Sequence, residues 1–138
     1  MIIKKVYDLA KLYNSYFSFE EKCCLSLNCN LNMREIRAIY SLSLLEKEKN
    51  NTPNKLANHL GVSPCIVSLI LKSLISKDYL QKISSMSDKR VSYLVLTERG
   101  RELCFKYIEA HQNAFEKISE ILTEKQLNEL EEIIKSDI

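Results

Sequence analysis

Glycine and proline are scarce in this chain: its 138 residues include only two of each, and tryptophan is absent. This scarcity disfavours a loop-rich β fold and favours long, uninterrupted helices. No run of about 18 apolar residues occurs, so we expect neither a membrane-spanning helix nor a membrane partner. The amino-terminal residues become polar too early for a signal peptide, and we therefore expect a cytoplasmic protein.

Residues typical of catalysis are also missing. The sequence has only two histidines, no glycine-rich phosphate loop, and no paired nucleophile and base at a motif spacing. We therefore expect a protein that is not an enzyme and that carries neither a cofactor nor a structural metal. The remaining composition, with 46% hydrophobic and 28% charged residues, is typical of one globular domain.

Charge is distributed unevenly along the chain, although the net charge is only +2. Residues 54–101 carry 8 Lys and Arg against 3 Asp and Glu, whereas residues 102–138 carry 4 against 9. A basic centre with an acidic tail suits a protein that binds phosphate with one face and turns another face away. Random scatter of charges over a solvated surface is the alternative.

Apolar residues recur at helical spacing at both ends of the chain. In the first helix they are Ile2, Val6, Leu9, Ala10, Leu12, Tyr13, Tyr16 and Phe17. In the last helix they are Leu127, Leu130, Ile133, Ile134 and Ile138. Residues 18–32 contain several turn formers and predict a break after the first helix. The apolar stripe of that helix needs a cover, which either the carboxy-terminal helices or a second subunit could supply.

Capping signals divide the centre of the chain into helices. Asn32 and Glu35 have the spacing of a capping box at the start of a second helix. The apolar face of that helix comprises Ile36, Ile39, Tyr40, Leu42, Leu44 and Leu45. Pro53, preceded by Thr52, fits the first turn of a short third helix, and Gly61 supplies the left-handed residue that ends it.

A fourth helix and a hairpin follow. Ser63 predicts the start of a helix over residues 63–77, whose buried stripe comprises Ile66, Val67, Ile70, Leu71, Leu74 and Ile75. Residues 79–84 and 91–96 alternate in polarity and flank a polar, basic tip. The order helix, tight turn, helix, hairpin over residues 52–97 is that of a winged helix-turn-helix, in which the second helix enters a DNA major groove.

Two further helices complete the chain. Thr97 is placed to cap a long helix that reaches about Glu120, and Thr123 with Gln126 forms a second capping box before the last helix. The predicted fold class is therefore mainly α, with a small β-hairpin wing.

The hairpin and the start of the following helix, SDKRVSYLVLTERG from Ser87 to Gly100, resemble the wing signature of the MarR (multiple-antibiotic-resistance regulator) family. That signature has an acidic residue and an arginine two positions apart at the wing tip, then Leu-Thr, then a glycine three residues after the threonine. The upstream residues in register with the family are Leu56, Ala57, Leu60, Val62, Ser63, Val67, Ser68, Leu74, Tyr79, Leu80 and Lys82. The resemblance extends over essentially the whole chain.

This resemblance implies a fold and a function. Residues 31–100 would form a winged helix-turn-helix core within a single domain over residues 1–138, and residues 1–30 and 101–138 would form helices that dimerise. The homodimer would bind double-stranded DNA at a pseudo-palindromic operator, with its recognition helices about one DNA turn apart. It would act as a transcriptional repressor, released from DNA by a small-molecule effector or by thiol oxidation.

The wing tip has a physical logic of its own. Asp88 can brace Arg90 so that its guanidinium projects as a rigid fork into a narrow, electronegative minor groove. Lys89 would add a phosphate contact. A surface ion pair that merely holds the loop shut is the structural alternative for Asp88 and Arg90.

The start of the helix over residues 63–77 would contact bases by family resemblance. Two positions depart from the usual pattern: Leu69, where relatives often carry arginine, and Cys65, where serine or threonine is common. The helix lacks a side chain for bidentate guanine contacts, so the wing and the shape of the DNA would contribute more to recognition. For Ser63, the alternative to a DNA contact is a purely structural role as an N-cap, and the two roles are compatible. The predicted DNA-binding residues are Asn54, Ser63, Pro64, Cys65, Ser68, Lys72, Lys82, Lys89 and Arg90.

Five cysteines are present, and Cys23, Cys24 and Cys29 lie close together in sequence. Hydroperoxide-sensing relatives oxidise a cysteine near the end of the first helix, and zinc-sensing relatives suggest a site that His111 would complete. Inert thiols are the third interpretation.

The alternative function is that of a winged-helix module that binds another protein and has lost DNA binding. It is suggested by the helix over residues 63–77, which has few side chains suited to contacts with bases. The charged wing tip argues against it, since a protein contact would not need Asp88, Lys89 and Arg90 there.

Overall fold

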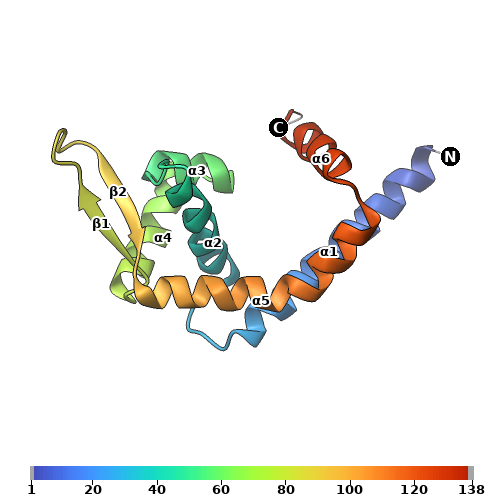
Figure 1. Ribbon diagram of the computed structural model, residues 1–138, viewed down its shortest axis with the longest axis horizontal. Helices are drawn as coiled ribbons and strands as arrows, with labels where there is room; N and C mark the ends of the chain where they lie inside the picture. Colours follow the sequence, from blue (N-terminus) through green and yellow to red (C-terminus); the bar gives the residue numbers. More distant parts are fainter. Residues whose placement is uncertain (1, 137–138) are drawn as a thin grey trace. The chain divides into compact units, whose positions relative to one another are not determined.

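The computed structural model describes residues 2–136, with side chains from Lys4 onward, so the predicted stripe residues Ile2 and Ile138 lie outside its described side chains. Six helices and two strands follow one another in this part (Figure 1). They are α1 (Ile2–Ser26), α2 (Met33–Lys47), α3 (Pro53–Leu60), α4 (Pro64–Ser76), β1 (Leu80–Ser84), β2 (Ser92–Leu96), α5 (Glu98–Ile121) and α6 (Glu124–Ser136). This order confirms the predicted mainly α fold with a hairpin. Over the described residues, no single helix is long and apolar enough to cross a membrane.

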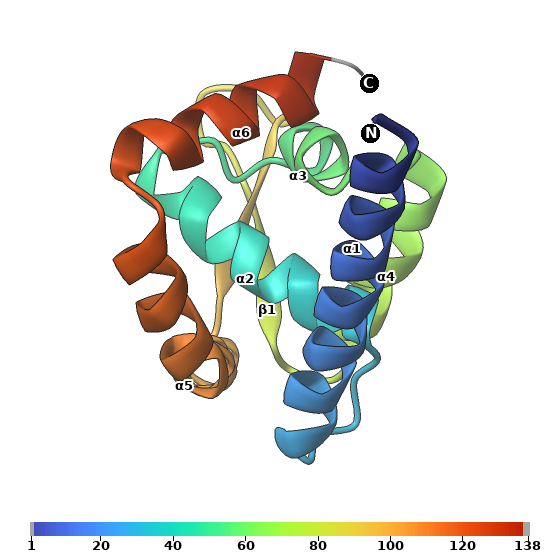
Figure 2. The same ribbon diagram turned by 90° about the vertical axis from the view of Figure 1, so that its right-hand side faces the viewer.

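The chain divides into two compact units, Met1–Tyr107 and Ile108–Ile138. The first unit contains α1 to β2 and the start of α5, and α1 lies against α2 within it (Figure 2). The second contains the rest of α5 and α6, where the predicted capping box is confirmed: the backbone N–H of Gln126 donates to Thr123 Oγ1 at 3.2 Å, and that of Thr123 donates to Gln126 Oε1 at 2.9 Å.

Helix α1 is longer than predicted. It continues to Ser26, so the expected break at residues 18–32 is wrong for its first half, and the turn begins only after Ser26. Cys23 and Cys24 continue the buried side of the helix. Glu20 is also buried there, and its carboxylate accepts a hydrogen bond from the Tyr107 hydroxyl at 2.6 Å. A glutamate with a hydrogen-bond partner can therefore be buried on the side of a helix that faces the core. The polar residues of this segment had suggested a turn instead of a helix.

Helix α2 lies at the centre of the first unit. The predicted capping box is confirmed, because the backbone N–H of Glu35 donates to Asn32 Oδ1 at 2.9 Å and that of Asn32 donates to Glu35 Oε1 at 3.1 Å. The apolar side chains buried along this helix are Ile36, Ala38, Ile39, Leu42 and Leu45. They form the main core together with residues from α3, α4, the hairpin and α5.

Two carboxylates of α2 reach neighbouring elements. Glu35 accepts a hydrogen bond from the Ser73 hydroxyl on α4 and lies 3.6 Å from the Lys77 ammonium. Glu46, at the other end of α2, accepts a hydrogen bond from the backbone N–H of Leu96 at 2.7 Å and pairs with Arg101 at 2.9 Å. Helix α2 is therefore tied to α4 at one end and to the base of the hairpin at the other.

The two helices of the helix-turn-helix are capped as predicted. Thr52 Oγ1 accepts from the backbone N–H of Lys55, Ser63 Oγ accepts from that of Ile66, and Gly61 has a left-handed φ of 69°. The chain bends by 111° between α3 and α4, which lies within the usual range for this motif.

Two residues of the predicted buried stripe of α4 are less buried than expected. Ile66 is half-buried, and Ile75 is 40% exposed, so its predicted burial is wrong. The side chains that are buried on α4 are Val67, Ile70, Leu71 and Leu74. Ile75 lies one position beyond this narrow stripe, so its side chain stands at the edge of the core.

The hairpin pairs antiparallel from Leu80 opposite Leu96 to Ser84 opposite Ser92, close to the predicted strands. The middle of β2 is held by the loop between α2 and α3. The backbone N–H of Leu94 donates to the Asn51 carbonyl at 2.7 Å, and the Asn51 side-chain amide donates to the Leu94 carbonyl at 2.8 Å. This contact orients β2 relative to the start of α3.

The Leu-Thr-x-x-Gly part of the wing signature joins the hairpin to α5. Thr97 Oγ1 donates to the Asp78 carbonyl at 2.7 Å and accepts from the backbone N–H of Gly100 at 3.1 Å, which confirms the predicted cap. A Cβ on Gly100 would lie only 2.2 Å from the Tyr79 carbonyl oxygen. Only glycine therefore allows this close approach of α5 to the backbone that precedes β1.

We predict that Gly100→Ala lowers the free energy of unfolding by about 1–3 kcal/mol, because the added methyl group overpacks a rigid backbone contact. Urea denaturation followed by circular dichroism measures this change. Gly61→Asn is the matched control: its position has no atom within 4 Å of an added Cβ, and asparagine tolerates the left-handed conformation. A Gly100→Ala midpoint equal to that of the parent would contradict the close packing.

Candidate nucleic-acid interface

The exposed face of α4 carries most of the residues predicted to contact bases. Pro64, Cys65, Ser68 and Lys72 are all exposed. Ser63 is exposed as well, and its hydroxyl oxygen accepts from the backbone N–H of Ile66 at 3.3 Å. Ser63 therefore caps α4, as its structural interpretation predicted. Its contact with DNA stays a prediction.

The wing tip holds Arg90 in a defined position. The Asp88 carboxylate accepts from the Arg90 backbone N–H at 3.0 Å and from the guanidinium Nε at 3.2 Å. The Arg90 side chain is nevertheless 91% exposed. Asp88 thus restrains the stem of this arginine while its guanidinium stays accessible, as a fork entering a groove would require.

Two neighbouring depressions connect α4 to the wing. One, of about 460 Å³, is lined by Pro53, Ser68, Leu71, Lys72, Ile75, Ser76 and Lys82. The other, of about 410 Å³, is lined by Thr52, Pro53, Asn54, Lys82, Arg90, Val91 and Ser92. Both are lined by Pro53 and Lys82, so five of the predicted DNA-binding residues border one continuous surface. Lys89 is exposed at the tip but lines neither depression, and neither do Ser63, Pro64 and Cys65.

This surface is positively charged partly because the sequence has no acidic residues over a long stretch. No aspartate or glutamate occurs from residue 49 to residue 77, a stretch that spans α3 and α4. Lys72, Lys82, Lys89 and Arg90 are all exposed. Over α3 and α4 no carboxylate opposes the phosphate backbone, and Asp88 on the wing is paired with Arg90.

The clustered cysteines do not form an evident reactive site. Cys23 and Cys24 are buried in α1, and Cys29 is half-buried after it. Burial and the nearby Glu20 carboxylate raise the pKa of Cys24 to about 12 and also raise the pKa of Cys23. Since the thiolate is the nucleophile, this environment disfavours reaction at neutral pH. No group of three His, Cys, Asp or Glu side chains suited to a metal ion occurs among the described residues.

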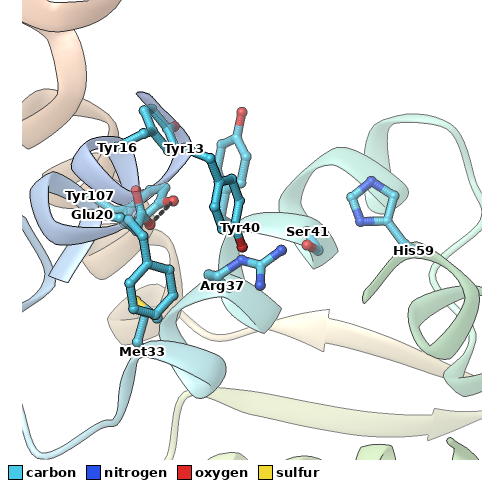
Figure 3. A pocket seen from close by; sticks show the side chains of 10 residues that line it. Tyr13, Tyr16, Glu20, Met33, Arg37, Tyr40, Ser41, His59 and Tyr107 are labelled. Carbon is cyan, nitrogen blue, oxygen red and sulfur yellow. Dashed lines mark hydrogen bonds between the residues drawn. The ribbon is translucent and has the colours of Figure 1, made fainter. Parts of the chain in front are cut away.

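A pocket between helices was not found by the sequence analysis. Its volume is about 350 Å³, and its lining residues, shown in Figure 3, are Tyr13, Tyr16, Phe17, Glu20, Met33, Arg37, Tyr40, Ser41, His59 and Tyr107. Aromatic rings from α1 and α2 surround it, and Arg37 supplies a cation. Burial and the Glu20 carboxylate raise the pKa of Tyr107, so its hydroxyl stays protonated and donates to Glu20. The tyrosines were visible in the sequence, but their convergence depends on tertiary packing.

The bend between α3 and α4, the exposed face of α4 and the charged hairpin define a winged helix-turn-helix protein.

Comparison with known proteins gives the family. Residues 31–92 match the sequence model of the MarR family. The transcriptional regulator AdcR of Streptococcus pyogenes is 24% identical over 107 residues, which cover 78% of this chain and 73% of AdcR. The winged segment over residues 31–92 therefore matches the MarR family, the family that the wing signature resembles.

Solved structures share the fold. FabT of Streptococcus pneumoniae in complex with DNA has 22% identity and a TM-score of 0.75, covering 99% of this chain and 94% of FabT. A mutant of MarR from E. coli complexed with operator DNA has 18% identity and a TM-score of 0.64, covering 100% and 99%. The adhesin competence repressor AdcR of Streptococcus pyogenes has 21% identity and a TM-score of 0.61, covering 99% and 94%.

We predict that a short pulse of iodoacetamide at about pH 8 labels Cys65 at least tenfold faster than Cys24 in the native protein. Cys65 is exposed, whereas Cys24 is buried and almost entirely in the thiol form. Peptide mass spectrometry measures the two rates, and labelling in urea controls for peptide detection. Equal native rates would identify Cys24 as a reactive thiol and favour the redox-sensing interpretation.

Proposed function

We propose that this MarR-family chain is a transcription regulator that binds double-stranded DNA as a homodimer. The observation that carries the proposal is the continuous basic surface formed by α4, the start of α3 and the wing, with Arg90 restrained by Asp88 at its edge. A protein-binding module would have no evident need for a guanidinium held in this way.

The proposed interaction uses two grooves. The exposed face of α4 enters the major groove, where Cys65, Ser68 and Lys72 meet base edges and phosphates. The wing lies over the adjacent minor groove, into which Arg90 inserts. Lys82, on β1 between these two sites, is placed to contact the phosphate backbone that separates the grooves. Asn54, in the first turn of α3, is placed to bind phosphate through its amide.

Dimerisation is inferred from exposed apolar surface. In α1, the exposed large apolar side chains are Val6, Tyr7, Leu9, Leu12, Tyr13, Tyr16, Phe17 and Leu25. In the second unit, they are Ile108, Phe115, Ile121, Leu127, Leu130, Ile133 and Ile134. Apolar stripes of this extent usually mark interfaces. A second copy of the chain as their partner matches the predicted division into a winged core over residues 31–100 and dimerising segments over residues 1–30 and 101–138.

Repression and release remain parts of the proposal. The name of the relative AdcR, a repressor, supports repression as the mode of action. For release, the pocket lined by Arg37 and several tyrosines suits a small aromatic anion. Such an effector would contact α1, α2 and α3 at the same time. Thiol oxidation is the weaker route, because the pKa values of Cys23 and Cys24 are raised.

We predict that Arg90→Ala weakens binding to duplex DNA by about 1–3 kcal/mol, and more on A·T-rich duplexes, whose minor groove is narrow. Lys89→Ala should cost less and should reduce the slope of log affinity against log salt by about one. Fluorescence anisotropy over a salt series measures both effects. Both variants should melt like the parent, because the tip is solvated.

Arg34→Ala is the matched control, since Arg34 is exposed on the first turn of α2 and outside the proposed surface. It should bind DNA like the parent. If Arg90→Ala also binds every duplex like the parent at physiological salt, the wing does not contact DNA, and the protein-interaction alternative becomes the better explanation.

We predict that the chain sediments at micromolar concentration with twice its mass of 16.0 kDa. Leu12→Glu should shift it toward monomer, because Leu12 is 65% exposed in the single chain and would be buried in the dimer. The neighbouring Lys11→Glu, on the polar side of α1, is the control and should leave the dimer intact. A stable, folded monomer of the parent chain would refute dimerisation.

A further inference from the structure

The recognition helix presents an aliphatic side chain at the centre of its exposed face. Leu69 is 70% exposed. Cys65, one turn earlier, and Lys72, nearly one turn later, are also exposed and lie on the same side of the helix. Ser68 completes this face. A helix face that is to enter a groove thus has leucine where a long polar side chain would ordinarily meet the bases.

The composition of α4 limits what it can recognise. Its sequence, PCIVSLILKSLIS, contains no arginine, asparagine, glutamine, aspartate or glutamate. It therefore has no arginine fork for guanine, no amide for adenine and no carboxylate for cytosine, and Lys72 is its one cation that could reach a guanine. For an apolar side chain such as that of Leu69, the matching group on the edge of a base pair in the major groove is the 5-methyl group of thymine.

The surroundings of Leu69 favour DNA over an apolar protein partner. Ser68 and Lys72 are exposed beside Leu69 on α4, and residues 49–77 contain no acidic side chain. A single apolar side chain flanked by a hydroxyl and a cation matches a groove in which isolated methyl groups are flanked by phosphates. It does not match the broad apolar surface of a protein interface core.

We propose that Leu69 contacts the 5-methyl group of thymine in the major groove and so makes the chain select thymine in each half-site. This inference rests on the proposed function, since it assumes that α4 enters DNA. Removing one methyl group that is buried against Leu69 should weaken binding by roughly threefold to fourfold per contacted thymine, from the usual value of a buried methylene group.

The test replaces thymine by deoxyuridine, which differs from it only by the methyl group. Duplexes are first selected from a random library with the purified full-length chain. Each thymine of a selected duplex is then replaced singly by deoxyuridine, and affinities are measured for the parent chain and for Leu69→Ala. Leu25→Ala is the matched control, because Leu25 is 79% exposed but lies on α1, away from the proposed DNA surface, and sedimentation checks that this variant has the same mass in solution as the parent. Thermal melts confirm that both variants fold.

The inference is supported if deoxyuridine weakens binding by the parent and Leu25→Ala at one or two positions of each half-site, while Leu69→Ala binds both duplexes equally. It is overturned, with the proposed function intact, if duplexes are selected but no thymine position is sensitive to deoxyuridine. Unchanged sensitivity in Leu69→Ala overturns the assignment to Leu69. Failure to enrich any duplex, with no binding to DNA at low salt, overturns both proposals together.

Discussion

The arrangement of the winged unit depends on two carboxylates at opposite ends of one helix. Glu35 and Glu46 are both largely buried on α2, where an unpaired charge would be costly. Each is instead satisfied by a partner from a distant segment: Glu35 by α4, and Glu46 by the end of β2 and the start of α5. Because α2 also carries the main apolar stripe, it sets the position of the recognition helix and the wing relative to each other.

Much of this fold was predictable because its helix boundaries are encoded locally. The caps at Asn32, Thr52, Ser63 and Thr97 each join a side chain to a backbone N–H only three residues away. A reader of the sequence therefore sees both partners at once. The hairpin was predictable for the same reason, since its strands alternate and its tip is polar. The wing residues followed from a motif of fourteen consecutive positions, SDKRVSYLVLTERG.

Features that depend on distant partners were missed. The extent of α1 was hidden because the buried carboxylate of Glu20 has a hydrogen-bond partner, Tyr107, that is 87 positions away. The contact between Asn51 and Leu94 spans 43 positions and follows from no local pattern. The same holds for the pocket lined by Arg37, since its tyrosines come from three helices. Ile75 was also predicted wrongly, because helical spacing identifies an apolar stripe but not which residues at its edge are buried.

Because of the hydrogen bonds between Asn51 and Leu94, the position of the hairpin does not depend on the length of its tip. These hydrogen bonds hold the middle of β2 against the loop before α3, whereas the hydrogen bonds described for the tip over residues 85–91 join residues of the tip to one another. Adding or removing residues at the tip would therefore change how far the hairpin extends without rotating α4. In the proposed complex with DNA, a longer or shorter tip would change the length of DNA under the wing and leave the contacts of α4 unchanged, so that footprint and base preference would be set by separate parts of the chain.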